Sequence, residues 1–287
     1  MEQCDILVIG GGAAGIAAAS SAAGKEAAVC LVEAEVALGG VLRQCAHHGF
    51  GAGLDGPGYI RMLRQMLPAG VNVQMETTVL ALSTARTALL ADASGARRSL
   101  GFARVILATG ASEIPAGALP LAGTRPEGVY TAGEMQARMN LYGEVPEGPV
   151  VILGSGDLGL IMAAQLEAEG LSVTLVERGA HAGGLPRNRG CLEATGVRLC
   201  CGRTIRELVG TGHLEAVILS DGTMLACRTL LIAVGLRPER VLARPLGDVP
   251  WLYLCGNCHR VHAMIESVVA EGAAIGQRAY EDWREER

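Results

Sequence analysis

The chain has 287 residues, of which 50% are hydrophobic and 18% charged, and its 24 basic and 29 acidic side chains give a net charge of −5. This length suits one large or two ordinary domains, and the apolar fraction excludes a disordered or collagen-like chain despite the 40 glycines. Because the net charge is negative and Lys and Arg form no long run, nucleic acid is not an expected partner.

The amino-terminal segment is apolar but does not resemble a membrane helix or a signal peptide. Residues 6–24 carry no charged side chain, yet glycines interrupt them and Glu2 and Asp5 precede them. A signal peptide instead begins with basic residues. We therefore expect no membrane span and a cytoplasmic protein. The nine cysteines are not spaced like a disulfide framework, so reduced thiols are expected.

The first 33 residues predict a strand, a glycine-rich turn, a helix and a second strand. The strand ILVI precedes the turn GGGAAG, an Ala-rich helix runs to Gly24, and the strand AVCLVE ends in Glu33. In a G-x-G-x-x-G turn the glycines allow a tight bend, close approach of a pyrophosphate and close helix packing, and the acid binds a ribose. The predicted dinucleotide-binding residues are Gly10, Gly12, Ala13, Ala14, Gly15 and Glu33.

The same pattern returns in the second half of the chain. Residues 149–177 contain the strand VVIL, the turn GSGDLG, a helix ending at Gly170 and the strand SVTLVE. In both copies the acid lies 18 residues after the last glycine of the turn. A single G-x-G-x-x-G is a weak signal, but two copies in this context predict two dinucleotide sites. The residues of the second site are Gly154, Gly156, Asp157, Gly159, Glu177 and Arg178.

Each copy is followed by alternating segments and an apolar strand. Residues 71–99 and 213–230 predict small antiparallel meanders, and the strands RVILATG and TLLIAVG close the two units. Domain boundaries are expected near residues 111–126 and 235–250. A final strand (WLYLCG) and a helix over residues 263–283 would then return to the first domain.

The predicted fold is therefore α/β, with two doubly wound Rossmann-like domains, the second inserted in the first. Two adjacent dinucleotide sites imply a flavin and a nicotinamide, because hydride passes readily between them. We expect FAD on residues 1–112 and 236–287 and NAD(P)H on residues 113–235. Glu177 favours NADH, since a carboxylate repels a 2′-phosphate, although nearby Arg178, Arg187 and Arg189 leave NADPH open.

The chain resembles the two-domain flavoproteins related to thioredoxin reductase, the pyridine nucleotide-disulfide oxidoreductase superfamily. The resemblance rests on six motifs that occur in the family's order: GGGAAG, LGGVLRQC, ILATGA, GSGDLG, AVG and YLCGN. The resemblance covers essentially the whole chain. It implies that the first glycine-rich turn and the ATG strand hold FAD and the second turn holds NAD(P)H. A late G-D motif touches the flavin ribityl chain in this family, and Asn257 stands here in place of the Asp.

The resemblance adds further cofactor-binding residues. They are Gly40, Val41, Leu42, Cys45, Val79, Ala108, Thr109, Gly110, Gly235, Gly256, Asn257 and His262. The segments LGGVLRQCAHHGFG, GSGDLGLIMA and CGNCHRVH more narrowly resemble bacterial flavoproteins found beside glycerol-3-phosphate or amino-acid dehydrogenase components.

The chain lacks the redox Cys-x-x-Cys that thioredoxin reductases carry in the nicotinamide domain. One cysteine, Cys45, follows Gly39-Gly40 and is a candidate catalytic thiol, with a packing role as the alternative. The sequence CGNCH (255–259) would suit haem attachment, a zinc site or a dithiol, but its overlap with the flavin-contact motif favours local structure, and no metal is predicted. His262 is a candidate catalytic residue that would stabilise reduced flavin from a helix start.

The expected function is an FAD-dependent NAD(P)H oxidoreductase that passes hydride from NADH to flavin N5 and electrons to an unidentified acceptor. Two alternatives stay open. One is a flavin-bearing electron-transfer subunit of a multi-subunit dehydrogenase with a vestigial nicotinamide site, and the other is a peroxidase or disulfide reductase that uses Cys45. The expected partners are NAD(P)H and the acceptor, with a dehydrogenase subunit or a second copy of the chain also open.

Overall fold

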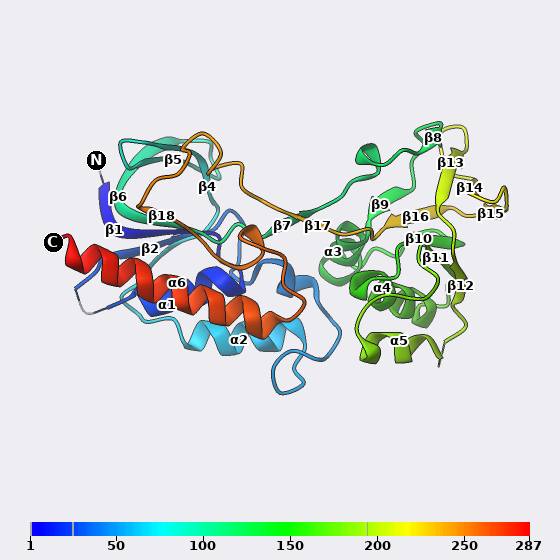
Figure 1. Cartoon of the computed structure of the whole chain (residues 1–287), viewed down its shortest axis with the longest axis horizontal. Coiled ribbons are helices and arrows are strands. Elements are labelled where there is room, and N and C mark those ends of the chain that lie inside the picture. The colour runs from blue at the N-terminus through cyan, green and yellow to red at the C-terminus, as the bar shows by residue number, and fades with distance from the viewer. Residues whose placement is uncertain (1, 25, 194) are drawn as a thin grey trace. The chain divides into compact units, whose positions relative to one another are not determined.

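The computed structural model describes residues 2–24, 26–193 and 195–287. The chain divides into two compact units (Figure 1). The first unit contains the residues up to Ser112 together with Arg237–Arg287, and the second contains Glu113–Leu236. The crossing segments β7 (Ala111–Glu113) and β17 (Leu236–Pro238) pair as a two-stranded sheet. The assignment of a different cofactor to each unit stays a prediction.

The first unit is built on a seven-stranded sheet in which five strands are parallel. In spatial order the parallel strands are β3 (Asn72–Gln74), β2 (Val29–Val32), β1 (Glu2–Ile9), β6 (Arg97–Leu107) and β18 (Leu252–Leu254). β6 is long enough to pair with two strands on one side. Its first half pairs antiparallel with β5 (Thr87–Asp92), which pairs in turn with β4 (Thr77–Ser83), and its second half pairs with β18. The predicted meander therefore continues directly into the parallel sheet.

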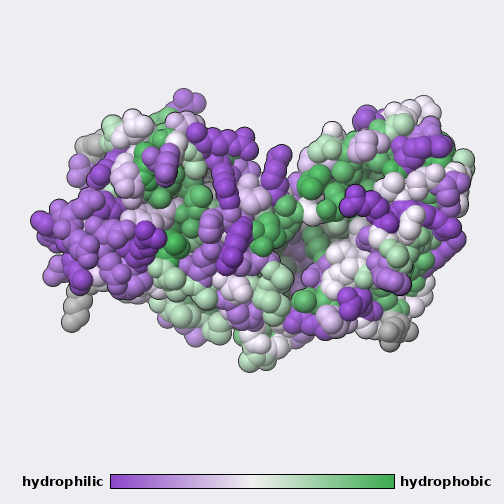
Figure 2. All heavy atoms as spheres, in the orientation of Figure 1, coloured by the Kyte–Doolittle hydropathy of each residue, from purple (hydrophilic) through white to green (hydrophobic). Residues whose placement is uncertain are grey.

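Two helices pack together on one face of this sheet. α1 (Ala13–Ala22) and α6 (Ile265–Glu285) lie side by side, as Figure 1 shows. Their approach is close because α6 presents glycines: a Cβ on Gly272 would meet the carbonyl oxygen of Ala14 at 2.4 Å. α2 (Gly56–Gln65) and the 3-10 helix η1 (Gly40–Gln44) extend this layer. The last turns of α6 carry charged side chains, which form the hydrophilic end of this unit in Figure 2.

The alternating pattern of the strands forms two cores in the first unit. Ile6 and Val8 of β1 face the helices, and Leu7 and Ile9 face the meander, as the period of a strand requires. The returning strand contributes to both sides, and the 3-10 helix η3 (Gly256–Cys258) follows it.

The second unit contains a five-stranded parallel sheet and a small meander. The parallel strands, in spatial order, are β12 (Arg198–Cys201), β11 (Val173–Glu177), β10 (Val150–Leu153), β16 (Thr229–Ile232) and β9 (Val129–Thr131). The second sheet has the order β15 (Met224–Ala226), β14 (Ala216–Leu219), β13 (Ile205–Val209) and β8 (Ala122–Gly123). The helices are α3 (Ala132–Tyr142), α4 (Asp157–Ala168) and α5 (Pro186–Glu193), and η2 (Ala116–Ala118) precedes β8.

The predicted fold class is confirmed, because each unit has a Rossmann-like parallel sheet and a meander, and the second unit is inserted in the first. The final helix begins two residues later than predicted, at Ile265. The sequence did not predict α2, α5 or the β9–α3 unit that precedes the second glycine-rich turn. Among the described residues, no helix is long and apolar enough to cross a membrane.

Candidate functional site

The two helices that follow the glycine-rich turns have uncapped amino termini. Among the described residues, no side chain caps the first turn of α1 at Gly12 or of α4 at Gly156. By contrast, Asp55 accepts from an N–H of α2 and Thr131 accepts from one of α3. Uncapped N–H groups and the positive end of the helix dipole suit an anion. Both turns therefore fit the pyrophosphate of a dinucleotide.

The outer glycines of each turn are required by backbone contacts. A Cβ on Gly15 would lie 1.8 Å from the carbonyl oxygen of Gly10, and one on Gly159 would lie 2.2 Å from that of Gly154. The middle glycines are different, because a Cβ on Gly156 would meet nothing within 4 Å and one on Gly12 would meet only the Cα of Gly40, at 4.0 Å. The middle positions thus leave room beside the helix terminus, as a bound phosphate needs.

The two predicted acids occupy equivalent positions. Glu33 accepts from the backbone N–H of Gly11 at 2.6 Å and of Glu35 at 2.9 Å. Glu177 accepts from the N–H of Ser155 at 2.9 Å and of Gly179 at 2.7 Å. Each carboxylate is therefore fixed at the end of the second strand and beside the glycine-rich turn, where it would bind a ribose diol.

The second site has additional polar side chains. The hydroxyl of Ser155 donates to Glu177 at 2.6 Å, and Asp157 accepts from the N–H of Leu185 at 2.6 Å and from Asn188 at 2.7 Å. Burial opposes ionisation of Glu177, but the hydrogen bonds from Ser155 and Gly179 and the charge of exposed Arg178 lower its pKa overall. The Glu177 carboxylate is therefore ionised at neutral pH.

The segment after Gly39 forms η1 and packs against the first glycine-rich turn. Gly39 donates to the carbonyl of Gly11 at 2.8 Å, and a Cβ on Gly40 would meet the Cα of Gly12 at 3.2 Å. Leu42 is buried, whereas Val41 is 61% exposed. These positions agree with a segment that runs beside a ligand held by the turn.

Cys45 directly follows η1 and lies in the interior. Its thiol is directed at the carbonyl of Val41, at 3.3 Å, and the residue is buried. Burial raises the pKa of the Cys45 thiol to about 12. A thiolate is the reactive form of cysteine, so this environment favours packing over redox chemistry. The catalytic role of Cys45 stays a prediction.

The strand ends predicted from the A-x-G motifs lie beside the turns. Ala108 donates to the carbonyl of Ile9 at 2.8 Å, and Thr109 donates through its hydroxyl to the carbonyl of Glu239. Gly110 and Gly235 both have positive φ angles, 75° and 133°, which allow the chain to turn out of each sheet. Val79 lies in β4, in the core on the meander side. The structure thus brings all of these except Val79 to the carboxyl ends of the parallel strands.

The loop between β18 and α6 is held by one carboxylate that the sequence did not indicate. Glu271 of α6 accepts from the N–H of Gly256, and its oxygens lie 2.8 Å from Nε2 of His262 and from Nδ1 of His259. Asn257 accepts from the N–H of His262 at 3.0 Å. His262 therefore directs Nε2 at Glu271, and its predicted catalytic role stays a prediction.

Cys255 and Cys258 are buried on opposite sides of the sheet. Cys255 belongs to the core beneath α1 and α6, and Cys258 belongs to the core on the meander side. Burial raises the pKa of both thiols. The described cysteines form no disulfide, and no group of three or more metal-ligating side chains is found in the described part of the chain. This arrangement favours packing for CGNCH.

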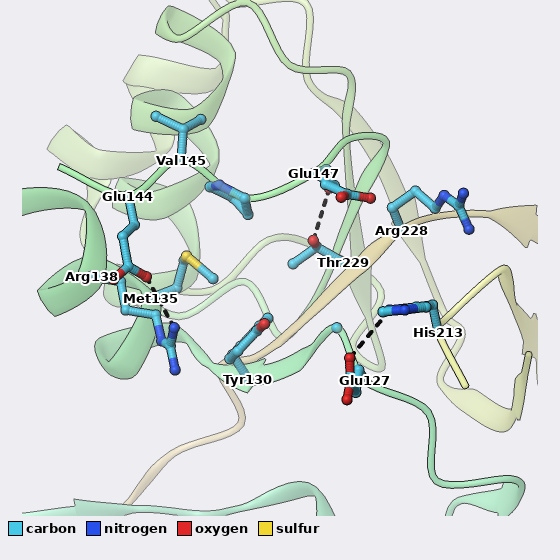
Figure 3. A pocket seen from close by; sticks show the side chains of 12 residues that line it. Glu127, Tyr130, Met135, Arg138, Glu144, Val145, Glu147, His213, Arg228 and Thr229 are labelled. Atoms are coloured by element: carbon cyan, nitrogen blue, oxygen red, sulfur yellow. Dashed lines mark hydrogen bonds and ion pairs between the residues drawn. The ribbon is translucent and has the colours of Figure 1, made fainter. Parts of the chain in front are cut away.

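A cavity of about 250 Å³ lies in the second unit, beside the amino-terminal ends of β9 and β16 (Figure 3). Parallel α/β sheets bind ligands at the opposite, carboxyl edge. Two pairs of polar side chains line it, Arg138 with Glu144 at 3.0 Å and His213 with Glu127 at 3.4 Å. The cavity is therefore separate from the glycine-rich turn.

Comparison with known proteins identifies the class that this fold and these turns define. The model of the pyridine nucleotide-disulphide oxidoreductase family matches residues 4–262, so the chain belongs to that family. The crystal structure of T. acidophilum thioredoxin reductase is similar in fold, with a TM-score of 0.80, 19% identity and coverage of 98% of this chain and 99% of that one.

Two of the curated proteins that are similar to this chain are named for different activities. An opine oxidase subunit of Rhizobium meliloti (strain 1021) is 32% identical over 186 residues, which is 63% of this chain and 40% of the relative. NADH oxidase of Methanocaldococcus jannaschii is 25% identical over 221 residues, or 67% of this chain and 48% of the relative. The chain spans about half the length of the curated relatives it matches.

Proposed function

We propose that this chain is an FAD-dependent NADH oxidoreductase, with FAD on the first unit and NADH on the second. The observation that carries the proposal is the duplicated cradle, in which each unit has an uncapped helix after a glycine-rich turn and a fixed carboxylate at the next strand. Membership in the pyridine nucleotide-disulphide oxidoreductase family supports it.

The protein's own groups have binding and orienting roles in this proposal. The N–H groups of α1 and α4 hold the two pyrophosphates, and Glu33 and Glu177 hold the adenosine riboses. When both cofactors are bound, the nicotinamide supplies a hydride and the flavin accepts it and passes electrons to an acceptor. No side chain needs to act as an acid or base in the hydride step, so positioning and exclusion of water are the tasks of the chain.

The charge of Glu177 supports NADH over NADPH. Its carboxylate is ionised and accepts from Ser155 and Gly179, which keeps it at the ribose position. A 2′-phosphate on this ribose would approach the negative charge of Glu177, whereas a 2′-hydroxyl would donate a hydrogen bond to it.

The test is an anaerobic titration of the FAD-loaded protein with NADH and, separately, with NADPH, followed by the visible absorbance of oxidised flavin. Bleaching by NADH at concentrations at which NADPH has little effect is the expected result. Flavin that neither nucleotide bleaches would refute the proposal. Admission of oxygen, a quinone or a small disulfide then identifies the class of acceptor.

A second candidate function is that of an electron-transfer subunit. It is favoured by the name of one relative, which is the subunit of an oxidase. In that case the flavin would receive electrons from substrate chemistry on a partner dehydrogenase subunit, and the nicotinamide site would be vestigial. The titration distinguishes the two functions, because an electron-transfer subunit would retain FAD and remain oxidised with either nucleotide.

A further inference from the structure

One carboxylate joins both ends of the loop between β18 and α6. Glu271 lies in the second turn of α6, and its Oε2 accepts from the N–H of Gly256 at the start of η3 and lies 2.8 Å from Nε2 of His262. Its Oε1 lies 2.8 Å from Nδ1 of His259 and 3.8 Å from Nε of Arg260. The loop of residues 256–262 is thus tied to the helix at three points.

These ties determine which way the amide of Asn257 faces. Asn257 lies between Gly256 and His262, and its Oδ1 accepts from the backbone N–H of His262 at 3.0 Å. A backbone N–H is always a donor, so this bond identifies the amide oxygen and places the NH₂ group on the other side. Among the described residues the Asn257 NH₂ group has no hydrogen-bond partner. It therefore offers two donors to a ligand oxygen.

The chemistry of Glu271 suits a fixed anchor. Burial opposes ionisation of this carboxyl, but the hydrogen bonds from His259, His262 and Gly256 outweigh it and lower its pKa. Either imidazole can donate to the carboxylate in a neutral tautomer or in the charged form. Hydrogen bonds to a charged acceptor are stronger than neutral ones, so the three ties act together.

We infer that Glu271 is a positioning residue for the loop of residues 256–262. By fixing this loop it holds Asn257 so that the side-chain amide donates to an oxygen of FAD. The inference rests on the proposed binding of FAD to the first unit. Glu271 acts through the loop, because the three groups that its oxygens contact, in Gly256, His259 and His262, all belong to the loop. The ligand group is an acceptor, either a phosphate or a ribityl hydroxyl oxygen, because an amide NH₂ group only donates.

The experiment measures the affinity of the full-length apoprotein for FAD by calorimetry, in single and double variants. Glu271→Gln has nearly the same shape as the native residue but offers one neutral acceptor oxygen, and we expect binding weaker by about tenfold or more. Glu281→Gln is the matched control, because Glu281 is exposed on the same helix and, within the described part of the chain, its carboxylate bonds to Gln277 alone. We expect wild-type affinity for this control.

A double-mutant cycle separates positioning from general stabilisation. Asn257→Ala should weaken FAD binding about fivefold or more in the native background, but less than about twofold when Glu271 is already Gln, because the displaced loop no longer presents Asn257. A rigid loop that needs no anchor predicts additive losses instead. Additive losses, or unchanged FAD affinity of Glu271→Gln, would overturn the inference.

Two further measurements keep the outcomes distinct. The affinity of each variant for NAD⁺ reports on the second unit, and we expect it to match the wild type. Failure of the wild-type apoprotein to take up FAD would refute the proposed function itself. Wild-type uptake of FAD with no coupling between Glu271 and Asn257 would refute only the positioning role.

Discussion

Replacement of the middle glycine of the second turn should separate ligand binding from folding. Gly156 has φ −64° and ψ 176°, which any residue adopts, and its Cβ would meet no atom within 4 Å. Alanine is a poorer N-cap than glycine by about 1 kcal/mol, and the smaller entropy of the unfolded chain returns about 0.4–1 kcal/mol. The net change in unfolding free energy for Gly156→Ala is therefore below about 1 kcal/mol, or a shift in Tm of less than about 4 °C.

The effect on binding should be much larger. The added methyl occupies the space beside the α4 terminus where a pyrophosphate would accept N–H bonds, and loss of these charged hydrogen bonds costs about 2–3 kcal/mol. This free energy corresponds to about 30- to 150-fold weaker binding. Calorimetric titration with NAD⁺ measures the loss without reducing the flavin. Wild-type affinity in Gly156→Ala would refute our placement of the dinucleotide on this turn.

Two companion variants define the comparison. Gly159→Ala places a Cβ 2.2 Å from the carbonyl oxygen of Gly154, so the helix must shift, and we expect a loss of about 1–3 kcal/mol of stability together with loss of NAD⁺ binding. Gly117→Ala is the control in the same unit, because Gly117 is exposed and a Cβ there meets nothing within 4 Å. A fall in the Tm of Gly156→Ala as large as that of Gly159→Ala would contradict the distinction.

Three further predictions concern charge, thiol chemistry and packing. Glu177→Gln should raise the NADPH preference over NADH about tenfold, measured as the ratio of kcat/KM values. Hydrogen bonds lower the pKa of Glu177 in the folded protein below its ordinary 4.5. The stability that the ionised carboxylate contributes is therefore fully present above pH 4.5 and is lost as the pH falls through the folded-state pKa. In this acidic range the Tm of Glu177→Gln should depend less on pH than that of the wild type. Cys45→Ser should retain most NADH-dependent flavin reduction and turnover, since burial keeps the native thiol protonated. Loss of turnover with intact FAD binding would instead support a peroxidase or disulfide reductase that uses Cys45. Gly272→Ala should lower both the free energy of unfolding, by about 1–3 kcal/mol, and the Tm, because its Cβ would meet the carbonyl oxygen of Ala14 at 2.4 Å. An unchanged Tm would show that α1 and α6 can separate freely.

The sequence predicted the parts of the site that depend on local backbone geometry. The glycine turns and Glu33 and Glu177 could be identified because strand, turn, helix and acid follow at fixed spacing. Glu271 could not, because it lies inside an ordinary amphipathic helix and acts on a loop that begins 15 residues earlier in the chain. A contact of this kind depends on how the loop folds back onto α6, and no residue pattern along the helix indicates it.

Another part of the site was present as a pattern but was not recognised. Gly39-Gly40 follows Glu33 at the same spacing as Gly183-Gly184 follows Glu177, so the duplication extends past the acid in both units. Gly40 and Gly184 both adopt positive φ angles, 51° and 69°, and each packs on its own glycine-rich turn. The predicted flavin-lining segment therefore has a counterpart in the second unit, in residues 183–188.

The two counterparts are attached differently, and the difference follows from two residues of the turns. In the first unit Gly39 donates to the backbone carbonyl of Gly11. In the second, Gly183 donates to the hydroxyl of Ser155, and Asp157 accepts from Leu185 and Asn188. Side chains thus replace a backbone contact at the second turn, where the first turn has only Gly11 and Ala13. The backbone therefore follows the same course through the turn and the glycine pair in both units. The two residues that differ, Ser155 and Asp157, add polar and acidic groups only to the unit to which we assign NADH.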